Sequence, residues 1–149
     1  VTLITAETPV KRPDSVEAGN HLYLGMNDIV SAMEGMVMPG EEHVRDLVDF
    51  ARRWDRERPV VVHCWAGISR STAGAFIMAC ALRPEVSEQA FARDIRLQSP
   101  TATPNSRLVE IGDRVLGRQG RMVEAVAAIG RGAFAYEGVP FALSIGRRG

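Results

Sequence analysis

The sequence lacks a net charge, a disulfide framework and a long apolar run, and each absence excludes a class of function. Its 18 basic and 18 acidic residues cancel, so no overall field favours nucleic acid or an anionic membrane as a partner. Two cysteines are too few for a disulfide scaffold, which favours a reducing compartment and predicts a cytoplasmic protein. No run approaches the ~20 apolar residues of a membrane span, and no signal peptide is visible.

Length and apolar content fit one domain. The 149 residues, 46% of them hydrophobic, suit a single globular domain over 1–149 with a real core. The sequence opens in a strand-like run, Val1–Ile4, without an initiator Met, which predicts a truncated N-terminus. The tail at 130–149 is glycine-rich with scattered apolar side chains, which predicts that it either docks loosely on the domain or orders against a partner. Nothing in the sequence indicates an oligomeric state.

One stretch, HCWAGISRS at 63–71, lies between a predicted strand and a predicted helix. Pro59–Val62 is β-branched and continuously apolar, which predicts a short strand buried on both faces of a sheet. Residues 72–82 are helix-permissive and almost without polar groups, which predicts a buried helix. Cys64 is therefore expected in a strand-to-helix turn.

Such a turn directs successive backbone N–H groups and the positive end of a helix dipole at one small volume, where a phosphate-sized anion fits. Gly67 lets the chain curl close to that anion. Arg70, six positions after Cys64, falls at the first turn of the helix, where its planar fork can hold two phosphate oxygens. The expected phosphate-binding residues are Trp65, Ala66, Gly67, Ile68, Ser69 and Arg70.

Cys64 is expected to react as a thiolate. The N–H donors, the helix N-terminus and the guanidinium should hold the pKa of the thiol well below its ordinary value of about 8.5. Phosphoryl transfer needs in-line attack and donors for the equatorial oxygens, and the loop would supply both without a metal. Ser71 is placed to donate a hydrogen bond to the sulfur, which would help the thiolate to leave in a second, hydrolytic step.

His63, Cys64, Gly67, Arg70 and Ser71 match, in order and spacing, the signature HCxxGxxR followed by Ser or Thr. The chain thus resembles the cysteine-based protein tyrosine phosphatases, and over about 22–116 their compact dual-specificity branch. The resemblance implies an α/β fold with a mainly parallel central sheet flanked by helices. It also implies metal-independent hydrolysis of phosphate monoesters through a phosphocysteine, without a cofactor, with His63 and Ser71 tuning the sulfur. Similar segments recur in small bacterial phosphatases, which implies a bacterial cytoplasmic enzyme.

Asp28 is the candidate general acid. Phosphoryl transfer from an ester needs an acid to protonate the leaving oxygen, and the same carboxylate can then act as a base toward water. Asp28 follows a predicted strand, His21–Met26, and opens a glycine-containing loop that could close over a pocket. The phosphatases that the chain resembles place their acid in a similar loop before the cysteine. The alternative is a turn or cap residue. Weaker rivals for the acid are Glu34, Glu41 and Glu42.

Further helices flank this core. A helix beginning near Glu41 presents an apolar stripe and leads back to the strand before Cys64, and this strand-helix-strand order predicts a parallel crossover. Ser87 is the expected N-cap of a helix through about Gln98. Thr103 is the expected cap of a later helix, with Pro104 in its first position. A short helix is expected over 122–129.

Several residues keep two interpretations. Asn105 either bonds the backbone of the phosphate loop, as the resemblance implies, or simply lies in the first turn of a helix. Trp65 either contacts the substrate at the pocket rim or packs beneath the loop, and Cys80 is either a redox partner of Cys64 or a buried core residue. His21 and His43 are expected at a strand edge and a helix surface, and without a Cys/His cluster no metal site is predicted.

The expected substrate is a phosphorylated protein or a small phosphomonoester. The loop interior at 65–69 has no lysine, whereas the inositol-lipid phosphatases that resemble this superfamily usually add basic residues there. Two other classes of function compete: a catalytically silent phosphate-binding module that docks a phosphoprotein, and sulfur or arsenate chemistry. The latter would need a resolving cysteine, for which only Cys80 exists.

Overall fold

Five α-helices, two short strands and one 3-10 turn make up the part of the chain that the structure, a computed structural model, describes, which is residues 1–146. The last three residues of the predicted tail at 130–149 lie outside the described residues. In chain order the elements are β1 (Thr2–Ile4), η1 (Ala18–Asn20), β2 (Tyr23–Gly25), α1 (Glu41–Arg53), α2 (Arg70–Leu82), α3 (Glu88–Gln98), α4 (Ser106–Leu116) and α5 (Arg121–Ile129).

The strands β1 and β2 form a parallel pair, with Leu3 opposite Leu24 in the register. The segment before the phosphate loop runs along the other side of β1: His63 forms an isolated parallel bridge with Thr2, and its carbonyl accepts from the N–H of Leu3 at 2.9 Å. Within residues 1–146 the sheet itself has two strands, so the parallel direction is seen but a larger central sheet is not.

The predicted strand at Pro59–Val62, buried on both faces, is wrong. These residues are extended chain outside any strand, and the Val61 side chain is 70% exposed. The physical reason is that only one face of the segment is covered: Val60 and Val62 pack against the core, whereas no layer covers Val61 on the other face. The pairing with β1 is made instead by the next residue, His63, which fixes where Cys64 leaves the sheet.

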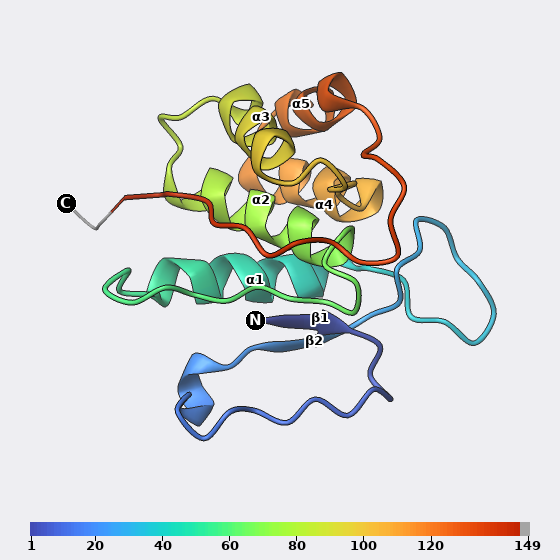
Figure 1. The fold of residues 1–149 in the computed structure, drawn as a ribbon, viewed down its shortest axis with the longest axis vertical. Coiled ribbons are helices and arrows are strands. Elements are labelled where there is room, and N and C mark those ends of the chain that lie inside the picture. The colour runs from blue at the N-terminus through green and yellow to red at the C-terminus, as the bar shows by residue number, and fades with distance from the viewer. Residues whose placement is uncertain (147–149) are drawn as a thin grey trace.

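Helix α2 is the centre of the molecule. Helix α2 packs against α1, α3, α4 and β1. Helix α5 in turn contacts both α3 and α4. Figure 1 shows the strand pair on one side of α1 and α2, with α3 and α5 on the other, and β1 is in direct contact with α2. Because α2 is enclosed by these neighbours, nearly all of its side chains are buried, as its continuous apolar sequence predicted.

The other helices confirm most of the sequence-based pattern. The apolar stripe of α1 is buried through Val44, Leu47, Val48 and Ala51. The Ser87 hydroxyl caps α3 by accepting from the N–H of Ala90 at 3.2 Å. The predicted cap of α4 is wrong: the cap is Asn105, whose side chain accepts from the N–H of Leu108 at 3.0 Å. Thr103 instead lies two residues earlier, outside the helix.

After α5 the tail returns across the molecule. Figure 1 shows this red segment passing over α2 on its way to the C-terminus. Phe141, Leu143 and Ile145 are partly buried against the core, whereas Phe134 and Tyr136, whose rings meet edge to face at 5.3 Å, are exposed. The tail therefore docks on the domain along its second half. No helix within residues 1–146 has both the length and the apolar character needed to cross a membrane.

Candidate active site

The phosphate loop runs from Cys64 to the start of α2 at Arg70. Gly67 has φ of +70°, a left-handed conformation that side chains disfavour, although a Cβ there would meet no atom within 4 Å. Glycine is thus required at this position by backbone conformation and not by space. It turns the chain so that the loop closes on itself.

The loop directs its N–H groups inward. Within the part of the chain that the structure describes, the backbone N–H groups at 65–70 have no oxygen acceptor. Buried or clustered N–H groups without acceptors are uncommon, because each costs free energy comparable to a lost hydrogen bond. Their convergence at a helix N-terminus forms a site for an anion with several oxygens.

The carbonyl groups of the loop point outward, and other segments hold them. Gly138 donates its N–H to the carbonyl of Ala66 at 2.7 Å, and Thr103 donates its N–H to that of Ile68 at 2.9 Å. The carbonyl of Ser69 accepts from the N–H of Asn105 at 3.2 Å and from that of Ala73 at 3.1 Å. The Thr72 hydroxyl also donates to the carbonyls of Ile68 and Ser69, at 2.6 and 3.0 Å.

The sulfur of Cys64 lies 3.2 Å from the hydroxyl oxygen of Ser71. Burial by itself raises the pKa of this thiol. The Ser71 hydroxyl, the backbone N–H groups of Ser71 and Gly67 and the charge of Arg70 outweigh that effect, so the pKa of Cys64 is lowered from its ordinary value. The structure thus brings the predicted nucleophile and Ser71 together in an environment that favours the thiolate.

Arg70 is buried with unused hydrogen-bonding capacity. Only 8% of its surface is exposed, and its Nη1 donates to the carbonyl of Met26 at 2.8 Å. Its Nε is buried and has no partner among the described residues. No ion pair between Arg70 and a carboxylate occurs within residues 1–146. An oxyanion in the loop would supply the counter-charge and the missing acceptor.

Asp28 lies beside the loop, on the surface. One carboxylate oxygen, Oδ1, accepts from the Ser69 hydroxyl at 2.6 Å and from the side-chain amide of Asn105 at 2.9 Å. Asn105 makes three contacts here. Its side chain caps α4, its backbone N–H donates to the loop carbonyl of Ser69, and its side-chain amide donates to Asp28. The contact with Asp28 was not predicted.

The two neighbours of Cys64 in the sequence differ in surroundings. His63 holds the loop to β1 through Nε2, which lies 2.7 Å from the Thr2 hydroxyl, and its Nδ1 lies 3.3 Å from the carbonyl oxygen of Cys64. Within the described residues, the ring contacts of His63 are therefore with the Thr2 hydroxyl and with the backbone of Cys64, and not with the sulfur. Trp65 is 76% exposed, which excludes packing beneath the loop.

Other candidate residues lie elsewhere. Cys80 is buried within α2, and burial raises its pKa to about 12. Glu41, a rival for the acid, pairs with Arg45 on the outer surface of α1 at 2.7 Å. Among residues 1–146, no group of three or more His, Cys, Asp or Glu side chains is placed to hold a metal ion.

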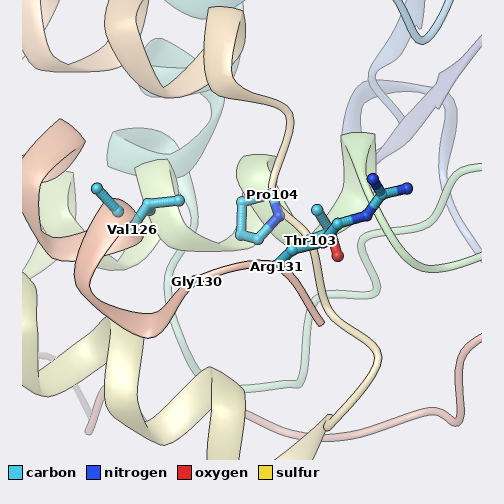
Figure 2. Close-up of a pocket in the computed structure, with 6 residues that line it drawn as sticks. Thr103, Pro104, Val126, Gly130 and Arg131 are labelled. Carbon is cyan, nitrogen blue, oxygen red and sulfur yellow. The ribbon is translucent and has the colours of Figure 1, made fainter. Parts of the chain in front are cut away.

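The structure has one cavity at the loop and a smaller hollow away from it. A cavity of about 610 Å³ reaches His63, Cys64 and Ser71 on one side and is walled by residues 137–143 of the tail on another. A smaller hollow of about 320 Å³ lies between the start of α4 and the end of α5 (Figure 2). Figure 2 shows the Arg131 side chain extending past Thr103, away from Val126. The smaller hollow contains none of the predicted site residues.

Two residues that hold the loop were not predicted from the sequence to do so. Thr103 was predicted only as a helix cap, and Gly138 was given no role. Both act through backbone N–H groups, and Gly138 is more than 70 residues from Cys64. The glycine-rich composition of the tail was visible, but it does not single out one glycine.

Comparison with known proteins gives one match. A family model described as "Polymorphic toxin system, DSP-PTPase phosphatase" matches residues 4–85, which include β2, α1, the whole phosphate loop and α2, and begin at the last residue of β1. No curated protein and no solved structure matches the chain.

Proposed function

The chain belongs to the polymorphic toxin system DSP-PTPase phosphatase family and is a phosphatase, and on this premise we propose that it hydrolyses phosphate monoesters through a phosphocysteine on Cys64. The observation that supports this most directly is Arg70, a buried guanidinium with a free Nε and no carboxylate partner, at the end of a loop whose N–H groups lack acceptors. A phosphate would complete both sets of hydrogen bonds.

In the first step, the Cys64 thiolate attacks the phosphorus while Arg70 and the loop N–H groups hold the non-bridging oxygens. An S–P bond forms as the P–O ester bond breaks. Asp28, in its protonated form, gives its proton to the leaving oxygen, which departs as an alcohol or phenol. Asn105 and Ser69 orient the carboxyl for this transfer through their contacts with Oδ1.

In the second step, the Asp28 carboxylate takes a proton from water as that water attacks the phosphorus. The S–P bond breaks, inorganic phosphate is released and the sulfur leaves as a thiolate. The Ser71 hydroxyl, 3.2 Å from the sulfur, stabilises this leaving group by donating a hydrogen bond. Asp28 regains its proton in this step, so the enzyme returns to its starting state without a metal or cofactor as a reactant.

The proposed substrate is a phosphorylated protein or a small phosphomonoester. The phosphate loop carries no lysine between Cys64 and Arg70, so a head group with several phosphates would find no added positive charge there. Trp65 is exposed next to the nucleophile and can contact an apolar or aromatic leaving group.

We further propose that residues 1–149 form one domain of the dual-specificity type. In this fold β1, β2 and the extended segment ending at His63 would be the parallel sheet, with α1 as the crossover. The bacterial cytoplasm remains the predicted location, since both thiols are free and Cys64 needs to stay reduced to react.

The test is hydrolysis of two phosphate esters in the presence of a chelator, one with a phenol and one with an alkyl alcohol as leaving group. We expect Cys64→Ser to abolish turnover of both. We expect Asp28→Asn to lower kcat by about 100-fold or more for the alkyl ester and by less for the phenyl ester, because a good leaving group needs little protonation. Asp46→Asn, on the exposed face of α1, is the matched control and should retain full activity.

Each result has one reading. Equal loss for both esters in Asp28→Asn would remove the acid role from this residue. Wild-type protein that is inactive but still binds orthovanadate would overturn the proposed catalytic function. The chain would then be a phosphate-binding module without turnover. Mass spectrometry of acid-quenched Asp28→Asn enzyme should detect phosphate on the peptide containing Cys64, and its absence during turnover would contradict the covalent intermediate.

A further inference from the structure

The tail touches the phosphate loop by a close approach of two backbones. The Gly138 N–H donates to the carbonyl of Ala66 at 2.7 Å. A Cβ at Gly138 would lie 2.5 Å from the carbonyl oxygen of Gly67, nearer than real side chains come to backbone atoms. Only glycine fits here without displacing the tail or the loop.

A second contact anchors the same segment. The Gly132 N–H donates to the Thr103 hydroxyl at 3.0 Å, and Thr103 in turn donates its own N–H to the carbonyl of Ile68. The tail between Gly132 and Gly138 therefore reaches the loop at two carbonyls, directly at Ala66 and through Thr103 at Ile68. Beyond Gly138 it becomes a wall of the cavity that opens at Cys64.

These contacts have a consequence for the inner side of the loop, because a peptide group is planar. The carbonyl of Ala66 and the N–H of Gly67 belong to one trans peptide and point in opposite directions. Holding the carbonyl outward therefore aims the N–H of Gly67 inward, where it contacts the Cys64 sulfur. The same reasoning links the Ile68 carbonyl to the N–H of Ser69.

We propose that Gly138 is a positioning residue of the active site, and that the tail segment 132–138 holds the phosphate loop in the conformation that binds phosphate. The inference rests on the proposed function, since it assigns a role in the same loop. The segment lies outside residues 4–85, which the family model matches, so the HCxxGxxR motif does not account for it.

The first experiment replaces Gly138 with Ala and uses Gly19→Ala as the matched control, since a Cβ at Gly19 would meet nothing within 4 Å. The readouts are kcat and KM for an aryl phosphate, the affinity for orthovanadate, and the pH profile of Cys64 alkylation. We expect kcat/KM of Gly138→Ala to fall by about 100-fold, because a shift of about 1 Å at a reacting group has that order of effect. The alkylation profile should move to higher pH, because the N–H of Gly67 no longer faces the sulfur.

The alkylation profile separates positioning from mere loss of folded protein, since unfolding lowers the active fraction without changing the thiol in the rest. Wild-type protein that neither hydrolyses the ester nor binds vanadate would overturn the proposed function itself. An active wild type, with Gly138→Ala indistinguishable from Gly19→Ala in all three readouts, would overturn only the role of Gly138.

A second measurement uses the unmodified protein and decides the matter if Gly138→Ala does not fold. If the tail holds the loop, filling the loop must stabilise the tail, because coupling between two sites is reciprocal. Hydrogen exchange of wild-type protein with and without orthovanadate should therefore show added protection at 132–139 as well as at 64–70. Protection of the loop alone, with the tail unchanged, would contradict the proposal.

Discussion

The two ends of α2 each have an arginine and a cysteine in or beside them, in opposite surroundings. A buried arginine lies near each end: Arg70 at the start, 8% exposed, and Arg118, 7% exposed, next to the last turns. Arg118 is fully engaged, since it pairs with Glu88 at 2.9 Å and donates to the carbonyl of Cys80 at 2.6 Å. Arg70 has one backbone acceptor and a free Nε.

The cysteines differ in the same way. Cys64 faces N–H and O–H donors that lower the pKa of its thiol despite partial burial, whereas the burial of Cys80 raises its pKa to about 12. The difference teaches that burial alone does not mark a functional group. A buried cation that has a carboxylate partner serves the stability of the fold. A buried cation that lacks such a partner is placed to bind an anionic ligand.

The strongest test of the difference between the two arginines is to replace each one by lysine. We expect Arg70→Lys to lower kcat by about 100- to 1,000-fold, because lysine keeps the charge but loses the fork that holds two oxygens. Arg118→Lys serves as the control and should leave kcat per folded molecule unchanged. Steady-state kinetics on an aryl phosphate measure kcat of both variants. Equal losses of kcat would show that the two arginines do not differ in function.

The next largest effect is expected on stability at the other end of α2. Glu88→Gln leaves Arg118 buried without its counter-charge and should cost about 3 kcal/mol of unfolding free energy in urea. Glu85→Gln removes an exposed partner of Arg83 instead and should cost much less, because solvent screens an exposed ion pair. A small effect of Glu88→Gln would show that Arg118 does not depend on this pair.

The stability difference should also depend on pH. Burial raises the pKa of Glu88, but hydrogen bonds from its backbone N–H and from Arg118, with the charge of Arg121, outweigh burial and lower it. The pair therefore contributes fully above the unfolded value of about 4.3, and its contribution is lost as the pH falls through the lower folded value. Wild type and Glu88→Gln should converge in stability on acidification.

The smallest expected effect concerns the thiol itself. Ser71→Ala removes the hydroxyl beside the Cys64 sulfur, which helps to lower the pKa of the thiol, so the pH midpoint of Cys64 alkylation should rise. Cys80, followed in the same sample by peptide mass spectrometry, is the internal reference and should stay unreactive in the folded protein. An unchanged midpoint would show that the backbone N–H groups and Arg70 are sufficient to lower the pKa of Cys64 without the Ser71 hydroxyl.

The sequence predicted what is local. The span from His63 to Ser71 could be identified because nucleophile, glycine turn and arginine lie within one short segment, and the helices followed from apolar spacing. The strand at Pro59–Val62 failed because an apolar run does not reveal whether a second layer covers it. The cap of α4 failed because Thr103 and Asn105 are both good caps, and the long-range contacts that hold Asn105, with Ser69 and Asp28, are not visible in the sequence.

Most of the loop contacts that the sequence could not predict are made by backbone atoms. The carbonyl of Met26 holds Arg70, and the N–H groups of Thr103 and Gly138 hold the loop. Every residue type except proline offers the same N–H, and every residue the same carbonyl, so these contacts leave no trace in residue identity. Gly138 is a partial exception, since its missing side chain is required by the approach of the Gly67 carbonyl.

The outward carbonyls of the phosphate loop also set an order of events during synthesis. The ribosome makes the loop before it makes Thr103, Asn105 and Gly138, whose N–H groups hold the carbonyls of Ile68, Ser69 and Ala66. The growing chain therefore contains the nucleophile and its arginine long before it contains the groups that fix their geometry. The loop receives its full set of contacts only when the tail has emerged.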